Sequence, residues 1–317
     1  IVSTARLTHA TPASVYARSA SRDWEAYVSD QTEDGVLCED IATQLLRSRF
    51  DVALGGGWAP FLGESFGGVR REKSMDLTAE WVARTNGTYV SNRIEMQEAP
   101  KDVPLLGLFS ISHMDFMADP GRDQDQPTLT QMTAEAINRL ENNPNGYYLM
   151  VEGGRIDHGH HAGRAGYALE EMVEFANSIQ FAIDNTDPEE TLILVTADHS
   201  HVFSIGGYPR RGNDILGLVI PPSEIEGFDE PSKAEDGKPF TTLSYSNGPG
   251  SIASMTHRPY PEIGLYAQQQ SAIPLSGETH SGEDVALYGN GPGAHRISGV
   301  IEQNLIYKII VGAFGWE

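Results

Sequence analysis

The stretch Glu-Gly-Gly-Arg-Ile-Asp-His-Gly-His-His at residues 152–161 constrains this chain more than any other. Directly before it, residues 146–151 form a short, continuous run of mainly aromatic and aliphatic side chains after an Asn-Pro-Asn turn, which predicts a buried strand. Acidic and imidazole side chains therefore begin where a strand ends. Carboxylate oxygen and imidazole nitrogen are ligands that zinc prefers, so this turn is a candidate metal site.

A second stretch repeats this arrangement. Residues 191–195 are β-branched and aliphatic, which predicts another buried strand, and Asp198 and His199 follow it. Between the strands, residues 165–185 carry apolar side chains at helical spacing. Such a unit is nearly always right-handed with parallel strands in one sheet, so both carboxyl ends share an edge. We therefore expect the two clusters to meet and to bind two zinc ions roughly 3.5–4 Å apart.

A more ordinary interpretation exists for each cluster alone. A histidine beside a glycine-rich turn is usually a solvated loop residue, and an aspartate after a strand is usually a helix cap. Two Asp/His clusters, each directly after an apolar strand, favour a metal site over that interpretation.

Length and charge limit the possible functions. The 317 residues suffice for one large α/β domain or two smaller ones. Lys and Arg total 22 against 44 Asp and Glu, and the net charge of −22 disfavours nucleic acid or an anionic membrane as a partner. No apolar run approaches the roughly 18–20 residues of a membrane span. The acidic, Lys-poor composition is compatible with a salt-adapted protein, although ordinary solubility requires no such adaptation.

The rest of the chain alternates strand and helix patterns. Thr11 before Pro12 is typical of an N-cap, with a helix beginning near residue 13. Cys38, the only cysteine, falls in the helical pattern of residues 34–47, which predicts a core thiol. His113 and Asp115 are expected in an exposed loop. The remaining predictions are strands at 1–7, 51–55, 89–91 and 105–111, and helices at 77–85, 128–142 and 297–312.

Three motifs together resemble alkaline phosphatase. They are residues 152–161, Thr-Ala-Asp-His-Ser-His at 196–201, and Gly-Glu-Thr-His-Ser-Gly-Glu-Asp-Val-Ala at 277–286. The similarity runs along nearly the whole chain. It implies an α/β fold, namely a three-layer α/β/α sandwich with a mostly parallel central sheet. Residues 1–220 and 276–317 would form the metal-binding catalytic domain, and residues 221–275 a crown-like excursion.

The resemblance also assigns ligands to three metal ions. A first zinc would be held by Asp157, His161 and His280, which leave one position open as a catalytic zinc requires. The protein ligands of the second zinc would include Asp198 and His199. A magnesium ion would be held by Thr11 and Glu152 and by an aspartate upstream of Ile1.

Further residues would support substrate and metals. Arg22 matches an arginine that holds two phosphate oxygens, a role suited to its planar guanidinium, and Asp23 could orient it. Three histidines would lie around the ligands: His201 would support a ligand carboxylate by hydrogen bonding, His9 would lie beside the magnesium, and His158 would lie near the metal site.

The activity implied by the resemblance is hydrolysis of small phosphate monoesters to inorganic phosphate through a phosphoserine intermediate, by a periplasmic or extracellular homodimer. The family's serine lies in an Asp-Ser-Ala motif, and these 317 residues contain no Asp-Ser pair. We therefore expect the chain to be the C-terminal part of a longer enzyme. Alone, it should bind one zinc and turn over phosphate esters poorly.

Two alternatives stay open. The first is a related metal-dependent phosphodiesterase or sulfatase. Arg22 and the magnesium ligands favour monoesters, because these groups can stabilise the additional negative charge of a phosphate monoester and its remaining non-bridging oxygens. The second is a metal-binding fragment without catalysis, whose only support is the missing Asp-Ser-Ala motif.

Overall fold

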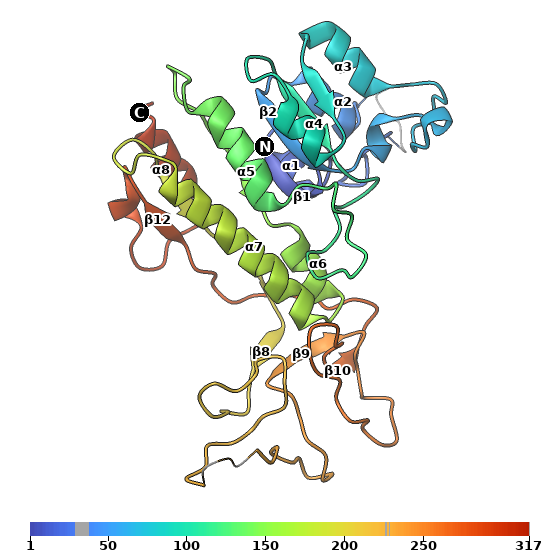
Figure 1. Cartoon of the computed structure of the whole chain (residues 1–317), viewed down its shortest axis with the longest axis vertical. Coiled ribbons are helices and arrows are strands. Elements are labelled where there is room, and N and C mark those ends of the chain that lie inside the picture. Colours follow the sequence, from blue (N-terminus) through green and yellow to red (C-terminus); the bar gives the residue numbers. More distant parts are fainter. Residues whose placement is uncertain (29–37, 226, 228, 317) are drawn as a thin grey trace. The chain divides into compact units, whose positions relative to one another are not determined.

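The computed structural model describes residues 1–28, 38–225, 227 and 229–316 (Figure 1). The chain divides into two compact units. Unit 1 comprises Ile1–Arg155 with Glu170–Ala182, and unit 2 comprises Ile156–Leu169 with Ile183–Glu317. The long helix α7 (Ala165–Asp184), which the helical pattern of residues 165–185 predicted, contributes residues to both. The expected crown-like excursion lies within unit 2, and its boundaries stay a prediction.

Unit 1 is built on a five-stranded sheet in the order β3-β4-β2-β1-β5, and every neighbouring pair is parallel. Four of its strands match predicted ones. The bounds are β1 (Val2–Arg6), β2 (Val52–Gly56), β3 (Thr88–Val90), β4 (Leu105–Leu108) and β5 (Val151–Glu152).

Alternating residues of this sheet face two different cores. Val52 and Leu54 pack into a core with α5 (Leu129–Leu140), whereas Ala53 packs into a second core. That second core contains side chains of α2 (Ile41–Arg47) and α3 (Leu77–Thr85). Because side chains alternate between the faces of a strand, the helices lie on opposite sides of the sheet (Figure 1). The predicted three-layer α/β/α sandwich is thus confirmed.

Local capping explains where the helices of unit 1 begin. Thr128 and Gln131 form a capping box at α5, and the Asp40 carboxylate accepts the Thr43 N–H at α2. The remaining helical elements are α1 (Ala10–Ser14), α4 (Arg93–Glu98), and the short 3-10 helices η1 (Ala59–Phe61) and η2 (Glu64–Phe66).

Two local predictions in unit 1 were wrong. Helix α1 begins at Ala10 with His9 as its N-cap, so Thr11 lies inside the first turn and does not cap it. Cys38 is exposed, because the described helix begins only at Ile41 behind the Asp40 cap. Residues 34–37 of the predicted helix lie outside the described residues.

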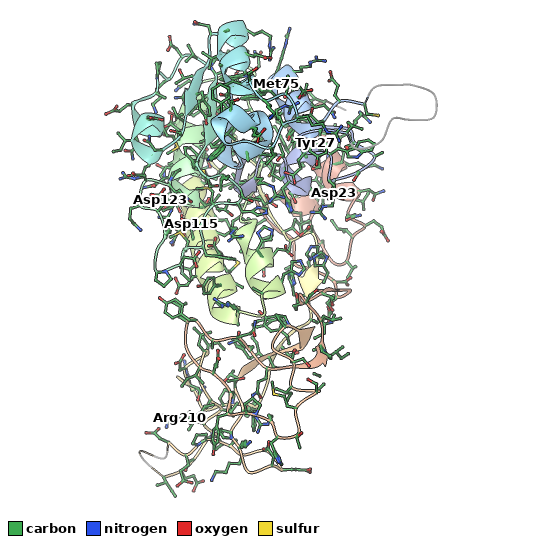
Figure 2. All side chains as sticks on the ribbon, turned by 90° about the vertical axis from the view of Figure 1, so that its right-hand side faces the viewer. Asp23, Tyr27, Met75, Asp115, Asp123 and Arg210 are labelled. Carbon is green, nitrogen blue, oxygen red and sulfur yellow. The ribbon has the colours of Figure 1, made fainter. Side chains whose placement is uncertain are left out.

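The loop at residues 113–126 also differs from its prediction. His113 and Asp115 are half-buried rather than exposed. The Asp115 carboxylate accepts hydrogen bonds from the Asp123 N–H at 2.9 Å and from Gln126 Nε2 at 3.1 Å. Figure 2 shows Asp115 and Asp123 next to each other in this loop. These hydrogen bonds therefore tie the two sides of the loop to each other.

The described residues of unit 2 form three small sheets and a small core. The core consists of Ala165, Leu243 and Tyr245, with half-buried apolar neighbours. β10 (Ser271–Pro274) runs parallel to β9 (Leu243–Gly248), and β8 (Phe203–Ile205) is antiparallel to β9. The other elements are α6 (Arg155–His161), β6 (Ile193–Val195), β7 (Ser200–His201), β11 (His280–Ser281), β12 (Tyr288–Asn290), η3 (Ala294–Arg296) and α8 (Leu305–Ala313).

The two strands that were expected to lie in one parallel sheet have other partners. The strand predicted at residues 146–151 is reduced to the two residues of β5, which pair with β1. β6 is half-buried and pairs antiparallel with β12. Local sequence specifies that these segments are extended, but distant segments decide their pairing. No helix among the described residues has the length and apolar character needed to cross a membrane.

Candidate metal centre

Helix α6 supplies the first two polar side chains of the site. Asp157 and His161 are four residues apart, so they lie on the same face of the helix, one turn apart. Their side chains meet there, with His161 Nε2 at 3.2 Å from Asp157 Oδ1.

A short antiparallel ladder brings two more histidines into the same unit. β7 and β11 pair so that His201 lies opposite His280. Two hydrogen bonds hold Thr279, the residue directly before β11. The Asn247 side chain, on β9, donates to Thr279 Oγ1 at 2.8 Å and accepts the Thr279 N–H at 3.1 Å. The backbone around His280 is therefore anchored to the main sheet of unit 2.

These elements converge on one carboxylate oxygen. His201 Nε2, His161 Nε2 and His280 Nε2 lie 3.1, 3.2 and 3.4 Å from Asp157 Oδ1. The Nε2 atoms of His161 and His280 are 3.1 Å apart. Within the described residues, Asp157 Oδ1 is a buried atom that makes no hydrogen bond of good geometry. A carboxylate oxygen and imidazole nitrogens around one point form a donor set that fits zinc.

The charges of the cluster reinforce its geometry. Burial alone would raise the pKa of the Asp157 carboxyl, but the contacts with His161 and His201 outweigh it and hold this pKa well below its usual range. The contact with Asp157 raises the pKa of His161 to about 9, against the effect of burial. Burial, together with the neighbouring His199, lowers the pKa of His280. The carboxylate of Asp157 is therefore ionised at neutral pH.

The residues expected at a second zinc lie beside this cluster. His199 Nε2 is 3.3 Å from Asp198 Oδ2, and the His199 ring stacks on the His280 ring with centroids 3.5 Å apart. The Asp198 side chain is 73% exposed. His199 also lies within reach of a shared ion with Asp157 and His201. The two expected ligand groups are thus adjacent in unit 2, as the sequence predicted, although the expected shared sheet is not what joins them.

Sequence reasoning missed a buried layer that supports the cluster. The Glu278 side chain is fully buried, and its Oε2 lies 2.7 Å from His201 Nδ1. His160 stacks on His201 with centroids 4.5 Å apart, and its Nδ1 lies 2.9 Å from the Tyr245 hydroxyl. Burial lowers the pKa of His160 to about 3, and His201 adds to this effect. The only sequence signal for Glu278 was its place two residues before His280.

In unit 1, Arg22 lies against a histidine. Arg22 is exposed, and its Nη2 is 3.1 Å from His9 Nε2. The Asp23 N–H donates to Ser21 Oγ, while orientation of Arg22 by the Asp23 side chain stays a prediction. His9 in turn makes an edge contact with His113, with ring centroids 5.0 Å apart.

The expected magnesium ligands lie on two elements that both border β1. Thr11 is on α1, and Glu152 is on β5, where its carboxylate accepts a hydrogen bond from the buried Ser3 hydroxyl. Ser3 also accepts the Ala5 N–H at 2.9 Å, so its hydroxyl is fixed toward Glu152. The geometry places the Glu152 carboxylate without showing a shared contact with Thr11.

The comparisons with known proteins agree with this picture. A family model described as alkaline phosphatase matches residues 1–315. The tissue-nonspecific isozyme of alkaline phosphatase from Gallus gallus is 40% identical over 338 residues, which cover 96% of this chain and 61% of that protein. Alkaline phosphatase from Gadus morhua is 40% identical over 332 residues, covering 96% of this chain and 66% of that protein.

Solved structures support the fold. A variant of the alkaline phosphatase from the Antarctic bacterium TAB5, described with bound Mg, matches 100% of this chain and 71% of its own length. The TM-score is 0.66 at 23% sequence identity, a similarity that bears on the fold alone.

Fold and site together define a metal-binding α/β protein. The family model and the curated relatives go further, and the chain belongs to the alkaline phosphatase family. It spans about three fifths to two thirds of the length of the curated relatives it matches.

Proposed function

We propose that this chain is the metal-binding part of an enzyme that hydrolyses phosphate monoesters, with two zinc ions and one magnesium ion. The observation that carries the proposal is the convergence of His161, His201 and His280 on the buried, unsatisfied Oδ1 of Asp157. Membership of the alkaline phosphatase family supplies the reaction class.

Asp157, His161 and His280 would hold the first zinc. Three protein ligands leave one coordination position for substrate or water. When bound, zinc supplies a Lewis acid that stabilises charge on a phosphoryl oxygen and on the leaving oxygen. The chain itself contributes an ionised carboxylate at Asp157 and the imidazole rings of His161 and His280.

The other sites are proposed from the family resemblance and from position. Asp198 and His199 would contribute to the second zinc, and Thr11 and Glu152 to magnesium. The remaining groups, an aspartate and the serine that becomes phosphorylated, are proposed to lie outside these 317 residues. A homodimer acting in the periplasm or outside the cell is the assembly that we propose with this activity.

Arg22 is the proposed phosphate-binding residue. Its planar guanidinium can donate two parallel hydrogen bonds to phosphate oxygens. The contact with His9 holds one end of the guanidinium while the exposed side chain leaves its other N–H groups accessible. His9 is thus proposed as a positioning residue for Arg22, with Asp23 as a second.

One comparison tests the function against its alternatives. The enzyme containing this chain together with the Asp-Ser-Ala segment should hydrolyse p-nitrophenyl phosphate far faster than bis(p-nitrophenyl) phosphate or p-nitrophenyl sulfate. A chelator should abolish this activity, and zinc with magnesium should restore it. Preference for the diester or the sulfate would establish the alternative class. Residues 1–317 alone should bind zinc with little turnover, and turnover equal to the complete enzyme would contradict the proposed position of the serine.

A further inference from the structure

The carboxylate of Glu25, close to Arg22 in the sequence, is bound to the end of strand β1. Its side chain is only 18% exposed. Glu25 Oε2 accepts a hydrogen bond from Arg6 Nε at 2.8 Å, and Oε1 accepts one from Arg6 Nη2 at 2.7 Å. The hydroxyl of the buried Thr8 also donates to Oε2. Because a bidentate arginine–carboxylate pair restricts the geometry of both groups, the Glu25 carboxylate has a defined position beside β1.

Arg6, the last residue of β1, is held from its other side as well. Its Nη1 donates to Ser112 Oγ at 3.1 Å and lies 2.6 Å from His113 Nε2. A guanidinium can only donate, and here Nε, Nη1 and Nη2 all have an acceptor. Arg6 is therefore a well-held anchor for Glu25.

The main chain of the segment that carries Arg22 is attached to helix α2. The Trp24 carbonyl accepts the Ile41 N–H at 2.8 Å, and the Glu25 carbonyl accepts the Ala42 N–H at 3.0 Å. N–H groups in the first turn of a helix have no partner within the helix, so these carbonyls satisfy them. The segment is thus held by its main chain from α2 and by the Glu25 side chain from β1.

These attachments bear directly on Arg22. His9 directly follows Thr8, and its Nε2 lies 3.1 Å from Arg22 Nη2. The contact between His9 and Arg22 therefore joins the same two segments that Glu25 joins through Thr8 and Arg6. Because Arg22 is exposed, packing around its side chain constrains it little. The distance between the two segments is then what keeps Arg22 beside His9.

We infer that Glu25 is a positioning residue: its hydrogen bonds with Arg6 and Thr8 set the spacing between His9 and Arg22, and thereby orient Arg22 for phosphate. The inference rests on the proposed role of Arg22. It assigns a part in phosphate binding to a carboxylate, a group that carries the same sign of charge as the ligand.

The charge of Glu25 gives the inference a test of sign. Burial alone would raise the pKa of the Glu25 carboxyl, but the hydrogen bonds from Arg6 and Thr8 outweigh it and lower this pKa. Glu25 is therefore ionised at neutral pH. A negative charge near an anion site weakens anion binding, so by charge alone Glu25→Gln should tighten phosphate binding. Positioning predicts the opposite, because Glu25→Gln loosens the attachment that keeps Arg22 in place.

Glu135 offers a matched control in unit 1. It lies on α5, its side chain is 7% exposed, and its Oε1 accepts a hydrogen bond from Arg139 Nε at 2.6 Å. Lys101 Nζ donates to the same carboxylate. Glu135→Gln therefore removes a carboxylate that is paired with an arginine, as Glu25→Gln does, but outside the segments that hold Arg22. General destabilisation of unit 1 should affect both variants.

The first test measures hydrogen exchange of the Ile41 and Ala42 amides in the metal-free 317-residue chain. Their acceptors are the carbonyls of Trp24 and Glu25, so these amides report on local opening of the segment. In Glu25→Gln both amides should exchange about tenfold faster than in the wild type, since hydrogen bonds to a charged group are lost. In Glu135→Gln they should stay within about twofold. Wild-type rates in Glu25→Gln, or an equal increase in Glu135→Gln, would overturn the inference.

The second test uses the complete enzyme and measures inhibition of p-nitrophenyl phosphate hydrolysis by inorganic phosphate. Glu25→Gln should raise the inhibition constant of phosphate about 3–30-fold, the range expected for coupled groups of one network. In an Arg22→Ala background the same substitution should cause no further loss, because the residue that it positions is gone. Glu135→Gln should stay within about twofold of the wild type.

Three results of this second test would overturn the inference. They are an unchanged inhibition constant in Glu25→Gln, a lower one, and an equal loss with and without Arg22. Wild-type phosphate inhibition in Arg22→Ala alone would instead contradict the proposed function of Arg22, and with it the phosphate part of the inference. The exchange rates of Ile41 and Ala42 decide separately whether Glu25 holds the segment.

Discussion

Unit 1 and unit 2 use opposite means to place their side chains. Unit 1 holds a five-stranded parallel sheet between two apolar cores, and Glu152, one of its candidate residues, lies on strand β5 of that sheet. The described part of unit 2 has a small apolar core, and imidazoles and carboxylates contact one another directly around Asp157. The difference teaches that apolar burial stabilises the architecture, whereas contacts among polar side chains specify the candidate metal site.

This contrast has an energetic consequence. Apolar burial stabilises unit 1 without any ligand. In unit 2, a metal ion that binds the donor set of the folded state but not the unfolded chain would increase the free energy of unfolding. We therefore expect zinc to stabilise unit 2 far more than unit 1.

Asp157→Asn should have the largest effect, because it should weaken zinc binding by unit 2. The amide oxygen lacks the negative charge of the carboxylate, so it is a much weaker ligand for a divalent cation. Zinc affinity should fall by at least about 100-fold, measured by competition with a chelating dye. Asp284→Asn, which removes the same charge from an exposed site in unit 2, is the control. Equal zinc affinity in Asp157→Asn and the control would contradict the assignment.

Leu54→Ala should lower the stability of unit 1 without changing zinc binding in unit 2. Leu54 is fully buried in a core of unit 1, and such a truncation typically costs about 2–5 kcal/mol of unfolding free energy. Urea unfolding followed by tryptophan fluorescence should show this loss, because three of the four tryptophans, Trp24, Trp58 and Trp81, belong to unit 1. Zinc affinity should stay unchanged, because Leu54 contributes to architecture alone. A parallel loss of zinc affinity would show that the two roles are not separate.

Much of the architecture could be predicted because each element carries its own pattern. The predicted helix at 77–85 coincides with α3, and α7 ends within one residue of its prediction. Pairing could not be predicted, because β6 finds its partner β12 more than 90 residues downstream. Cys38 shows a second limit, since the Asp40 cap starts the described helix after it.

The candidate site, like the architecture, could be predicted only in part from the sequence. Asp157, His161, Asp198 and His199 were singled out because each pair follows an apolar run and combines two ligand types. His280 needed the family resemblance, since a single histidine in a polar segment has no distinctive local pattern. Glu278 was missed because an acid has no sequence signal for complete burial. Only the β7–β11 register places its carboxylate against His201.

Glu171→Gln should have the smallest effect and should be confined to unit 1. Burial raises the pKa of Glu171 from its ordinary 4.5 to about 7, although the Met117 N–H donates to it at 2.7 Å and Arg155 opposes the shift. The folded state then binds more protons than the unfolded state between these values, so the free energy of unfolding falls as pH rises from about 4.5 to about 7.

Glu171→Gln removes this proton uptake, so its unfolding free energy should depend less on pH over that range. Urea unfolding of the metal-free chain at several pH values, followed by tryptophan fluorescence, measures the slope. The same pH slope in both proteins would show that Glu171 does not account for it. Asp284→Asn again provides a control, since loss of an exposed carboxylate should leave the slope nearly intact.

The most direct test of the central claim is an anomalous difference map at the zinc edge from crystals of the zinc-loaded protein. The account predicts a peak about 2.0–2.2 Å from Asp157 Oδ1, His161 Nε2 and His280 Nε2, the distances usual for zinc with oxygen and nitrogen ligands. A peak held by other residues, or no peak near Asp157, would contradict the claim that this polar cluster is the metal centre.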